Sequence, residues 1–342
     1  MQLRIFLLKR VLLVLPTLLG LTILVFTISR VFPRNPVAMW AGQAAARNPE
    51  LTKSLISSYH LGEPIYIQFY YYLIDLLHGN LGVSPISKRP IVDDLAQYFP
   101  NTIELAIVTL LLSTLVGIVL GIVSAVRKDR PIDYAGRIVS LIGVAIPEFW
   151  LGLLMQLVFF YVLGILPPGG MLDEAVAVKY PVYRITGMIL FDALFTANWH
   201  ALTNHLLHMI MPAIALGLPC IAVLSRMVRS CMLEVMHKDY VKTARAFGYA
   251  ERIITFKHAL RNAIVPSVTV IGTNFGVLMS GAVVIETVFY WPGIGRYLTN
   301  AIFLADFPAI VATTQIIGIV YILANLSVDM LYGILDPRIR FG

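Results

Sequence analysis

The sequence lacks the short motifs with which proteins commonly bind nucleotides or cleave bonds. No glycine is followed by lysine, so the phosphate-binding loop G-x-x-x-x-G-K-[ST] is absent. The zinc-binding pair H-E-x-x-H and the nucleophile turn G-x-S-x-G are also absent. These absences predict a chain that is not an enzyme and that carries no nucleotide site or cofactor of its own.

Three histidines are the best candidates for metal ligands, because they lie close together before an apolar stretch. They are His200, His205 and His208. Imidazole is a common metal ligand, but a histidine near a membrane surface also serves as an ordinary hydrogen-bonding group. We expect the second role, and therefore no metal site.

Isolated polar residues inside apolar stretches form another group of candidates. A charge at the centre of a bilayer costs about 2.5–3.5 kcal/mol on insertion scales, so such groups tend to face a bundle interior or a wet cavity. Polar side chains also hold neighbouring helices together. The candidates for lining a path through the membrane are Glu148, Thr273, Asn274 and Gln315.

The densest group of basic residues surrounds the stretch DYVKTARAFGYAERIITFKHALRNAIVP, residues 239–266. Lys238, Lys242 and Arg245 are four and three residues apart, which places them on one face of a helix. A second face carries Val241, Ala244 and Gly248 and would present small side chains to water.

Gly248 also suits the C-terminus of this short helix, because glycine readily adopts the left-handed conformation found there. The helix is too polar to enter lipid. Its residues fit a loop that binds the anionic headgroups of membrane lipid, and they fit equally a docking element for a protein partner.

The composition around these groups is that of an integral membrane protein. Of the 342 residues 58% are hydrophobic and only 13% are charged, whereas a soluble domain carries about 25% charged residues. The mean hydropathy is +0.80. We attribute the net charge of +7 to basic cytoplasmic loops and not to nucleic-acid binding.

Six apolar stretches are long enough to cross the membrane as helices, since a hydrocarbon core of about 30 Å needs about 20 residues. They span residues 11–29, 105–126, 138–164, 206–225, 262–285 and 307–328. Strict alternation of apolar and polar residues is absent, which argues against a barrel. The sequence thus predicts an all-α integral membrane protein with six transmembrane helices, forming one domain over residues 1–342.

Two loops of this domain are large. Residues 30–100 form an outer loop after the first span, and residues 226–261 form a loop between spans four and five. Within the outer loop, EPIYIQFYYYLIDLLHGNLG predicts a helix with Pro64 in its first turn and Gly79 at its end.

The distribution of basic residues predicts that both termini are cytoplasmic, because cytoplasmic segments carry an excess of Lys and Arg. With the N-terminus inside, 17 of the 26 Lys and Arg residues lie in inner segments and 9 in outer ones. The loop at 226–261 is then cytoplasmic.

Several segments resemble permease subunits of ABC transporters, in the branch that carries oligopeptides, dipeptides and nickel. The segments are VLLVLPTLLGLTILVF, HMIMPAIALG, DYVKTARAFG, HALRNAIVPSVTVIG, GAVVIETVFYWPGIGRYL and NLSVDMLYGILDPRIR. They follow one another over nearly the whole chain, and the resemblance is greatest to the B subunits of dipeptide permeases.

In this family a cytoplasmic coupling helix follows the pattern E-A-A-x3-G-x9-I-x-L-P. Gly248 matches the glycine and Ala244 the second alanine, whereas Lys242 and Thr243 replace the first two residues of the pattern. The resemblance implies that a coupling helix lies between spans four and five. Its residues would be Lys238, Asp239, Tyr240, Lys242, Thr243, Ala244, Arg245, Phe247 and Gly248.

The resemblance also implies a set of partners. A second homologous permease subunit would complete the translocation path, two ABC ATPase subunits would bind ATP and Mg, and an extracytoplasmic peptide-binding protein would deliver the substrate. Membrane lipid would surround the chain in the cytoplasmic membrane of a prokaryote. The implied function is import of dipeptides or oligopeptides.

Three other functions remain open from the sequence. A nickel permease of the same branch would have a similar sequence, and the three histidines favour it slightly. An oligosaccharide permease is a further alternative within the branch. A secondary transporter acting alone commonly has two related halves, and the sequence shows no internal repeat.

Overall fold

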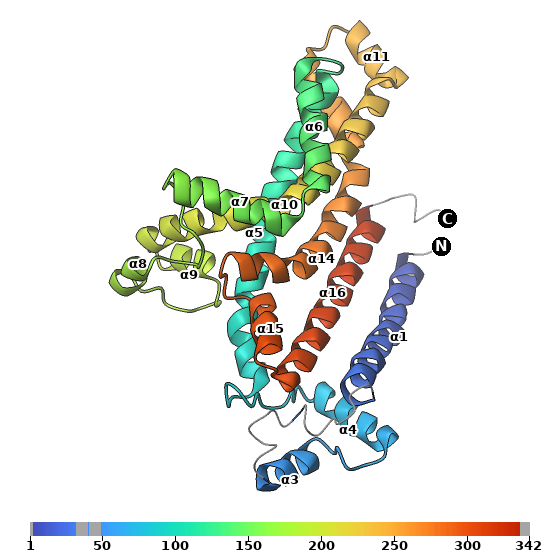
Figure 1. Cartoon of the computed structure of the whole chain (residues 1–342). Helices are drawn as coiled ribbons and strands as arrows, with labels where there is room; N and C mark the ends of the chain where they lie inside the picture. Colours follow the sequence, from blue (N-terminus) through green and yellow to red (C-terminus); the bar gives the residue numbers. More distant parts are fainter. Residues whose placement is uncertain (1–2, 32–39, 41–48, 336–342) are drawn as a thin grey trace.

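Helices joined by loops make up the described part of the chain, residues 3–31, 40 and 49–335 of a computed structural model (Figure 1). These residues contain no β-sheet beyond one isolated bridge between Val83 and Pro90. Four of the helices in these described residues are long and apolar enough to cross a membrane. They are α1 (Leu3–Arg30), α5 (Ile91–Val126), α10 (Trp199–Met236) and α16 (Phe307–Leu335).

Two bent helix pairs raise the number of candidate spans to as many as six. In the first pair, α6 (Pro131–Ala145) meets α7 (Glu148–Met155) and the π-helix η1 (Gln156–Val162) at 108°. In the second, the segment made of α12 (Glu251–Ile253), η2 (Ile254–Ala259) and α13 (Leu260–Ala263) meets α14 (Val265–Val288) at 58°.

Prolines explain both bends. Ile146 adopts an extended conformation (φ −82°, ψ 126°) directly before Pro147, as expected for a residue whose helical conformation would clash with the proline ring. Pro266 lies in the first turn of α14 and cannot donate the hydrogen bond that would continue α13. The apolar stretch predicted at 138–164 is therefore a bent pair and not one straight helix.

The pair α5 and α10 forms the centre of the molecule. A Cβ atom placed on Gly121 of α5 would lie 2.6 Å from the Cβ of Val228 and 2.8 Å from the carbonyl oxygen of Ser225. Glycine therefore permits the close approach of the two helices. With 36 and 38 residues, both helices are at least about 54 Å long, so they extend well beyond a hydrocarbon core.

The helix α5 begins at Ile91, so the last part of the predicted outer loop, which was expected to end at Pro100, is helical. The helix predicted in that loop is confirmed. It is α4 (Ile65–Leu77), which starts directly after Pro64 and is followed by Gly79 with a positive φ of 73°. It lies near α3 (Pro49–Ser58), at the end of the molecule opposite α11 (Figure 1).

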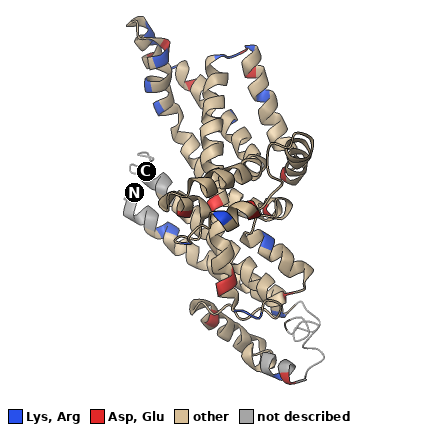
Figure 2. Cartoon of the chain, turned by 90° about the vertical axis from the view of Figure 1, so that its left-hand side faces the viewer, with Lys and Arg blue, Asp and Glu red and all other residues tan. Residues whose placement is uncertain are grey.

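The helices α1 and α16 lie side by side and run in opposite directions, so the described ends near the N- and C-termini face the same way (Figure 1). Short helices complete the fold. They are α8 (Glu174–Lys179) and α9 (Ile189–Phe195) between η1 and α10, α11 (Asp239–Ala246) after α10, and α15 (Ile294–Phe303) after α14. Lys and Arg gather at the end formed by α11 and the turn between α5 and α6 (Figure 2).

Candidate functional site

The short helix α11 projects from the end of α10 (Figure 1). Its C-terminus has the two hydrogen bonds of a Schellman motif, from Gly248 N to the Arg245 carbonyl (2.9 Å) and from Tyr249 N to the Ala244 carbonyl (3.3 Å). Gly248 has a φ of +77°, which glycine adopts without the steric cost that a Cβ would add. The helix and the glycine at its end, both predicted from the sequence, are confirmed.

Two of the three residues of the small-residue face of α11 are buried inside the chain. Val241 and Ala244 are 0% and 7% exposed and pack against Ile254 of η2. The prediction that this face is presented to water is wrong for these two residues, because the chain turns back after Gly248 and η2 covers them, whereas Gly248 itself is exposed. Ala244 thus holds α11 close to its own chain.

The three basic residues of α11 and its N-terminal flank are already paired with acidic groups of the same chain. The pairs are Lys238 with Glu234 (3.0 Å), Lys242 with Asp239 (2.9 Å) and Arg245 with Glu251 (2.8 Å). Lys242 lowers the pKa of Asp239, and Glu251 raises the pKa of Arg245. Exposed pairs of this kind contribute little to stability because water and salt screen them, so a partner can displace them at little cost.

The outward side of α11 carries exposed aromatic rings. Phe247 is 78% exposed and Tyr249 52% exposed. We call Lys242, Thr243, Arg245, Phe247 and Tyr249 the α11 surface; all five are exposed. A large apolar ring held in water beside exchangeable charges has the composition of a protein-docking site.

Side-chain hydrogen bonds connect the helix α11 to the segment that follows it. The hydroxyl of Tyr240 accepts a hydrogen bond from the side-chain amide of Asn262 (2.9 Å), and Arg245 binds Glu251 through two nitrogens, at 2.8 and 3.3 Å. Asn262 belongs to α13, directly before α14. Through Asn262, α11 is therefore connected to the segment directly before α14.

The predicted path residue Glu148 begins α7, just after the break at Pro147. A Cβ atom on Gly281 of α14 would lie 3.2 Å from the Glu148 carboxylate oxygen Oε2 and 3.3 Å from Leu216 of α10. Glu148 therefore lies where α7, α10 and α14 meet, next to the helix that follows η2 and α13.

The other predicted path residues are divided between two helices. Thr273 and Asn274 lie on α14; Thr273 is exposed and bonds to the Val270 carbonyl (3.0 Å), whereas Asn274 is buried. Gln315 lies on α16, where its amide donates to the Thr22 hydroxyl of α1 (3.0 Å). The structure thus places Glu148, Thr273 and Asn274 on helices that pack together, and Gln315 at the separate interface of α1 and α16.

Sequence reasoning missed a buried carboxylate, Glu286, at the end of α14. Its Oε1 accepts from the Thr102 hydroxyl (2.6 Å), and its Oε2 accepts from the backbone N–H groups of Gly295 (2.7 Å) and Arg296 (3.1 Å). Glu286 is 0% exposed, so these donors replace water. Its position in the apolar stretch GAVVIETVFYW was the available signal.

The three histidines do not point toward a common metal position. His205 is buried, with Nδ1 2.8 Å from the Met171 carbonyl and Nε2 3.3 Å from Glu104. His208 bonds to a backbone carbonyl of its own helix, and His200 stacks on a tyrosine ring. Among the described residues no group of three or more His, Cys, Asp or Glu side chains could hold a metal ion.

Comparisons with known proteins identify the family. Residues 117–341 match the family described as binding-protein-dependent transport system inner membrane component. The chain is 41% identical over 323 residues to the probable D,D-dipeptide transport system permease protein DdpB of Escherichia coli strain K12, covering 94% of each chain. It is 38% identical over 333 residues to the dipeptide transport system permease protein DppB of Alkalihalophilus pseudofirmus, covering 97% of this chain and 98% of the relative.

A third relative, DppB of Escherichia coli strain K12, is 37% identical over 338 residues and covers 98% of both chains. This chain therefore belongs to the family of inner-membrane components of binding-protein-dependent transport systems, and it is a multi-pass membrane protein. The resemblance to ABC permeases of the dipeptide and oligopeptide branch is confirmed.

Proposed function

We propose that this chain is the transmembrane permease subunit of an ABC importer that moves dipeptides or oligopeptides across the cytoplasmic membrane of a prokaryote. The relatives that it matches over nearly their whole length are named as dipeptide permeases. The observation that carries the proposal is α11, a short helix packed on η2, which has exposed basic and aromatic side chains beside it at one end of a bundle of apolar helices.

In the proposed topology the chain crosses the membrane six times, with each bent pair counted as one crossing and both termini in the cytoplasm. The shared direction of the described ends of α1 and α16 supports it (Figure 1). So does the gathering of Lys and Arg at the α11 end (Figure 2), because basic residues are retained on the cytoplasmic side.

The proposed partners are two ABC ATPase subunits, a second homologous permease subunit and an extracytoplasmic peptide-binding protein. The α11 surface would dock on an ATPase, with Phe247 as its anchor. Closure of the ATPases around ATP and Mg would move α11. The Tyr240–Asn262 hydrogen bond and the packing of Val241 and Ala244 on Ile254 would transmit this movement to α14.

The proposed translocation path runs beside α14, where Glu148 approaches Gly281. Thr273 and Asn274 lie on the same helix, and the second permease subunit would supply the opposite wall. In this scheme the chain is passive, since ATP is bound and hydrolysed by the partner subunits and no cofactor is held here.

The test is reconstitution of this chain with its two ATPases, second permease and binding protein in proteoliposomes. We expect ATP-dependent uptake of a radiolabelled dipeptide such as Ala-Ala, and none when the chain is omitted. ATP-dependent uptake of nickel or of an oligosaccharide, with no uptake of peptides of any length, would contradict the proposal.

A further inference from the structure

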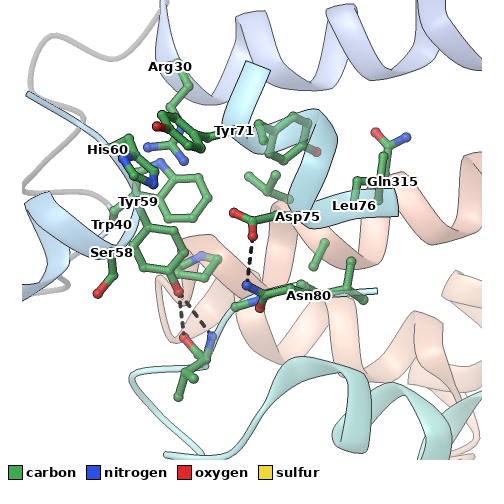
Figure 3. A pocket seen from close by; sticks show the side chains of 17 residues that line it. Arg30, Trp40, Ser58, Tyr59, His60, Tyr71, Asp75, Leu76, Asn80 and Gln315 are labelled. Carbon is green, nitrogen blue, oxygen red and sulfur yellow. Dashed lines mark hydrogen bonds between the residues drawn. The ribbon is translucent and has the colours of Figure 1, made fainter. Parts of the chain in front are cut away.

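A pocket of about 340 Å³ lies at the end of α1 that is remote from α11, between α4 and α16 (Figure 3). Its walls include the side chains of Arg30, Trp40, Tyr59, Tyr72, Asp75 and Gln315. A volume of this size is at the small end of ligand pockets. Under the proposed topology the pocket faces the outer side of the membrane.

Arg30 at the end of α1 is a buried cation with unused hydrogen-bond donors. Its side chain is 6% exposed, and its guanidinium carbon lies 3.9 Å from the centre of the Trp40 ring and 5.9 Å from that of Tyr59. Its Nε and Nη1 atoms have no hydrogen-bond partner within the described chain. Burying unpaired donors of a charged group is costly, and a carboxylate is the acceptor that satisfies a guanidinium best.

Acceptors lie elsewhere on the pocket wall. Asp75 of α4 is partly buried, and its Oδ1 already accepts from Asn80 (3.0 Å; Figure 3). The carbonyl oxygen of Gln315 on α16 is buried and has no hydrogen-bond partner among the described residues, although its amide nitrogen is bonded. These groups suit an ammonium or amide N–H of a ligand.

Aromatic rings form much of the remaining wall. The Trp40 and Tyr59 rings lie 4.6 Å apart, and the Tyr71 ring stacks on His60 at 3.8 Å. Such rings can bury the uncharged body of a ligand while the polar groups set its orientation. The pocket therefore offers a donor, Arg30, for a carboxylate and two acceptors, Asp75 and Gln315, for an amino group. Together with the aromatic walls, these groups favour a small molecule that carries both.

We propose that this pocket binds a short peptide, with the peptide's carboxylate on Arg30 and its amino group toward Asp75 and Gln315. It would be a recognition site on the permease itself, separate from the path beside α14. The choice of a peptide over another zwitterion rests on the proposed function, whereas the need for a carboxylate and an amine rests on the pocket.

The test uses the full chain in lipid nanodiscs, without a binding protein, and isothermal titration with the dipeptide Ala-Ala. We expect binding that is lost when both peptide termini are blocked, as in N-acetyl-Ala-Ala-amide. Arg30→Gln should weaken binding of Ala-Ala at least tenfold, and Asp75→Asn should also weaken it. Arg184→Gln, a change at an exposed arginine of the other outer segment, should leave it unchanged.

Thermal unfolding of each variant checks that it is folded. If Arg30→Gln does not fold, Asp75→Asn and the blocked peptide still decide the question. Equal binding of free and blocked peptide, equal binding by Asp75→Asn and the parent chain, or no binding by the parent chain would overturn the inference.

This binding experiment and the uptake experiment in proteoliposomes together separate this inference from the proposed function. A chain that binds no peptide, in a complex that still imports peptide, would refute the pocket assignment alone. A complex that imports no peptide, built from a chain that binds Ala-Ala through Arg30, would refute the proposed function alone.

Discussion

Thr102 on α5 donates a hydrogen bond of 2.6 Å to Glu286 on α14, and this contact joins two helices that are far apart in the sequence. The Thr102 oxygen in turn accepts from the backbone N–H of Ile294, the first residue of α15 (2.8 Å). Because Gly295 and Arg296 in the first turn of α15 also donate to Glu286, this carboxylate lies at the positive end of the α15 dipole. The carboxylate and the hydroxyl together lock the connection between α14 and α15 onto α5.

Replacing Thr102 by valine should destabilise the chain, because Glu286 would lose a donor and the Ile294 N–H would lose its acceptor. Buried groups left without a partner cost about 1–3 kcal/mol each. We expect a lower thermal-unfolding midpoint in detergent for Thr102→Val. The matched control is Thr203→Val on α10, where the threonine is exposed and bonds only within its own helix. Equal midpoints for the two variants would show that the contact does not stabilise the fold.

The outer segment should lose stability at acidic pH through Asp192 on α9. Burial raises the pKa of Asp192, but hydrogen bonds from the Thr186 N–H and hydroxyl and from the N–H groups of Ile185 and Gly187 outweigh it. The pKa in the folded chain is therefore below its ordinary value of about 3.9. The stabilisation that ionised Asp192 gives the folded chain is therefore fully present above about 3.9 and is lost as pH falls through the lower pKa of the folded state.

The measurement compares thermal unfolding of the parent chain and Asp192→Asn across pH. The parent should be more stable at pH 7, and the difference should shrink as pH falls below about 4. Glu174→Gln, at an exposed acid of the neighbouring helix α8, should show no such difference. A gap between parent and Asp192→Asn that is constant over this range would contradict the role assigned to the ionised carboxylate.

Local signals in the sequence predicted much of the fold. Apolar stretches located the helices that can span a membrane, and Gly248 with the basic residues before it located α11 and its end. Contacts between distant segments could not be predicted in this way. The burial of Ala244 depends on η2 folding back over α11, and Glu286 finds Thr102 only after α5 and α14 have packed. Proline alone did not predict the bend at Pro147, because Pro212 and Pro219 lie inside the continuous helix α10.

The proposed topology predicts a specific labelling pattern. In a chain with Cys220 and Cys231 replaced by alanine, single cysteines at Lys53 and Lys179 should react with an impermeant thiol reagent added outside intact cells. A cysteine at Arg252 should react only after the cells are opened. All three positions are exposed in the structure, so burial does not limit the reaction. The reverse pattern would require the opposite orientation.

The isolated chain should neither bind nor hydrolyse ATP, because its sequence has no phosphate-binding loop of the G-x-x-x-x-G-K-[ST] type. The purified subunit would be tested with a fluorescent ATP analogue and by phosphate release. Hydrolysis should appear only after the two ATPase subunits are added. Nucleotide binding by the subunit alone, in a preparation shown to be free of ATPases, would contradict a passive role.

The last prediction concerns Phe247, the more exposed of the two aromatic side chains of the α11 surface. Truncation of an aromatic anchor at the centre of a protein interface costs about 2–4 kcal/mol, which corresponds to at least about a thirtyfold loss of affinity. Phe247→Ala should therefore weaken co-purification with the ATPase subunits and reduce peptide-stimulated ATP hydrolysis. It should leave insertion and thermal stability unchanged, since the ring is 78% exposed.

The matched control is Phe303→Ala, because Phe303 is 81% exposed at the end of α15, away from α11. Ala244→Trp is a poorer probe, since a larger side chain would displace α11 from Ile254 and alter the fold of the loop itself. If α11 served only to bind anionic lipid, Phe247→Ala would not affect ATPase association in detergent. A Phe247→Ala permease that still co-purifies with its ATPases and imports peptide at the parental rate would exclude Phe247 as the docking anchor.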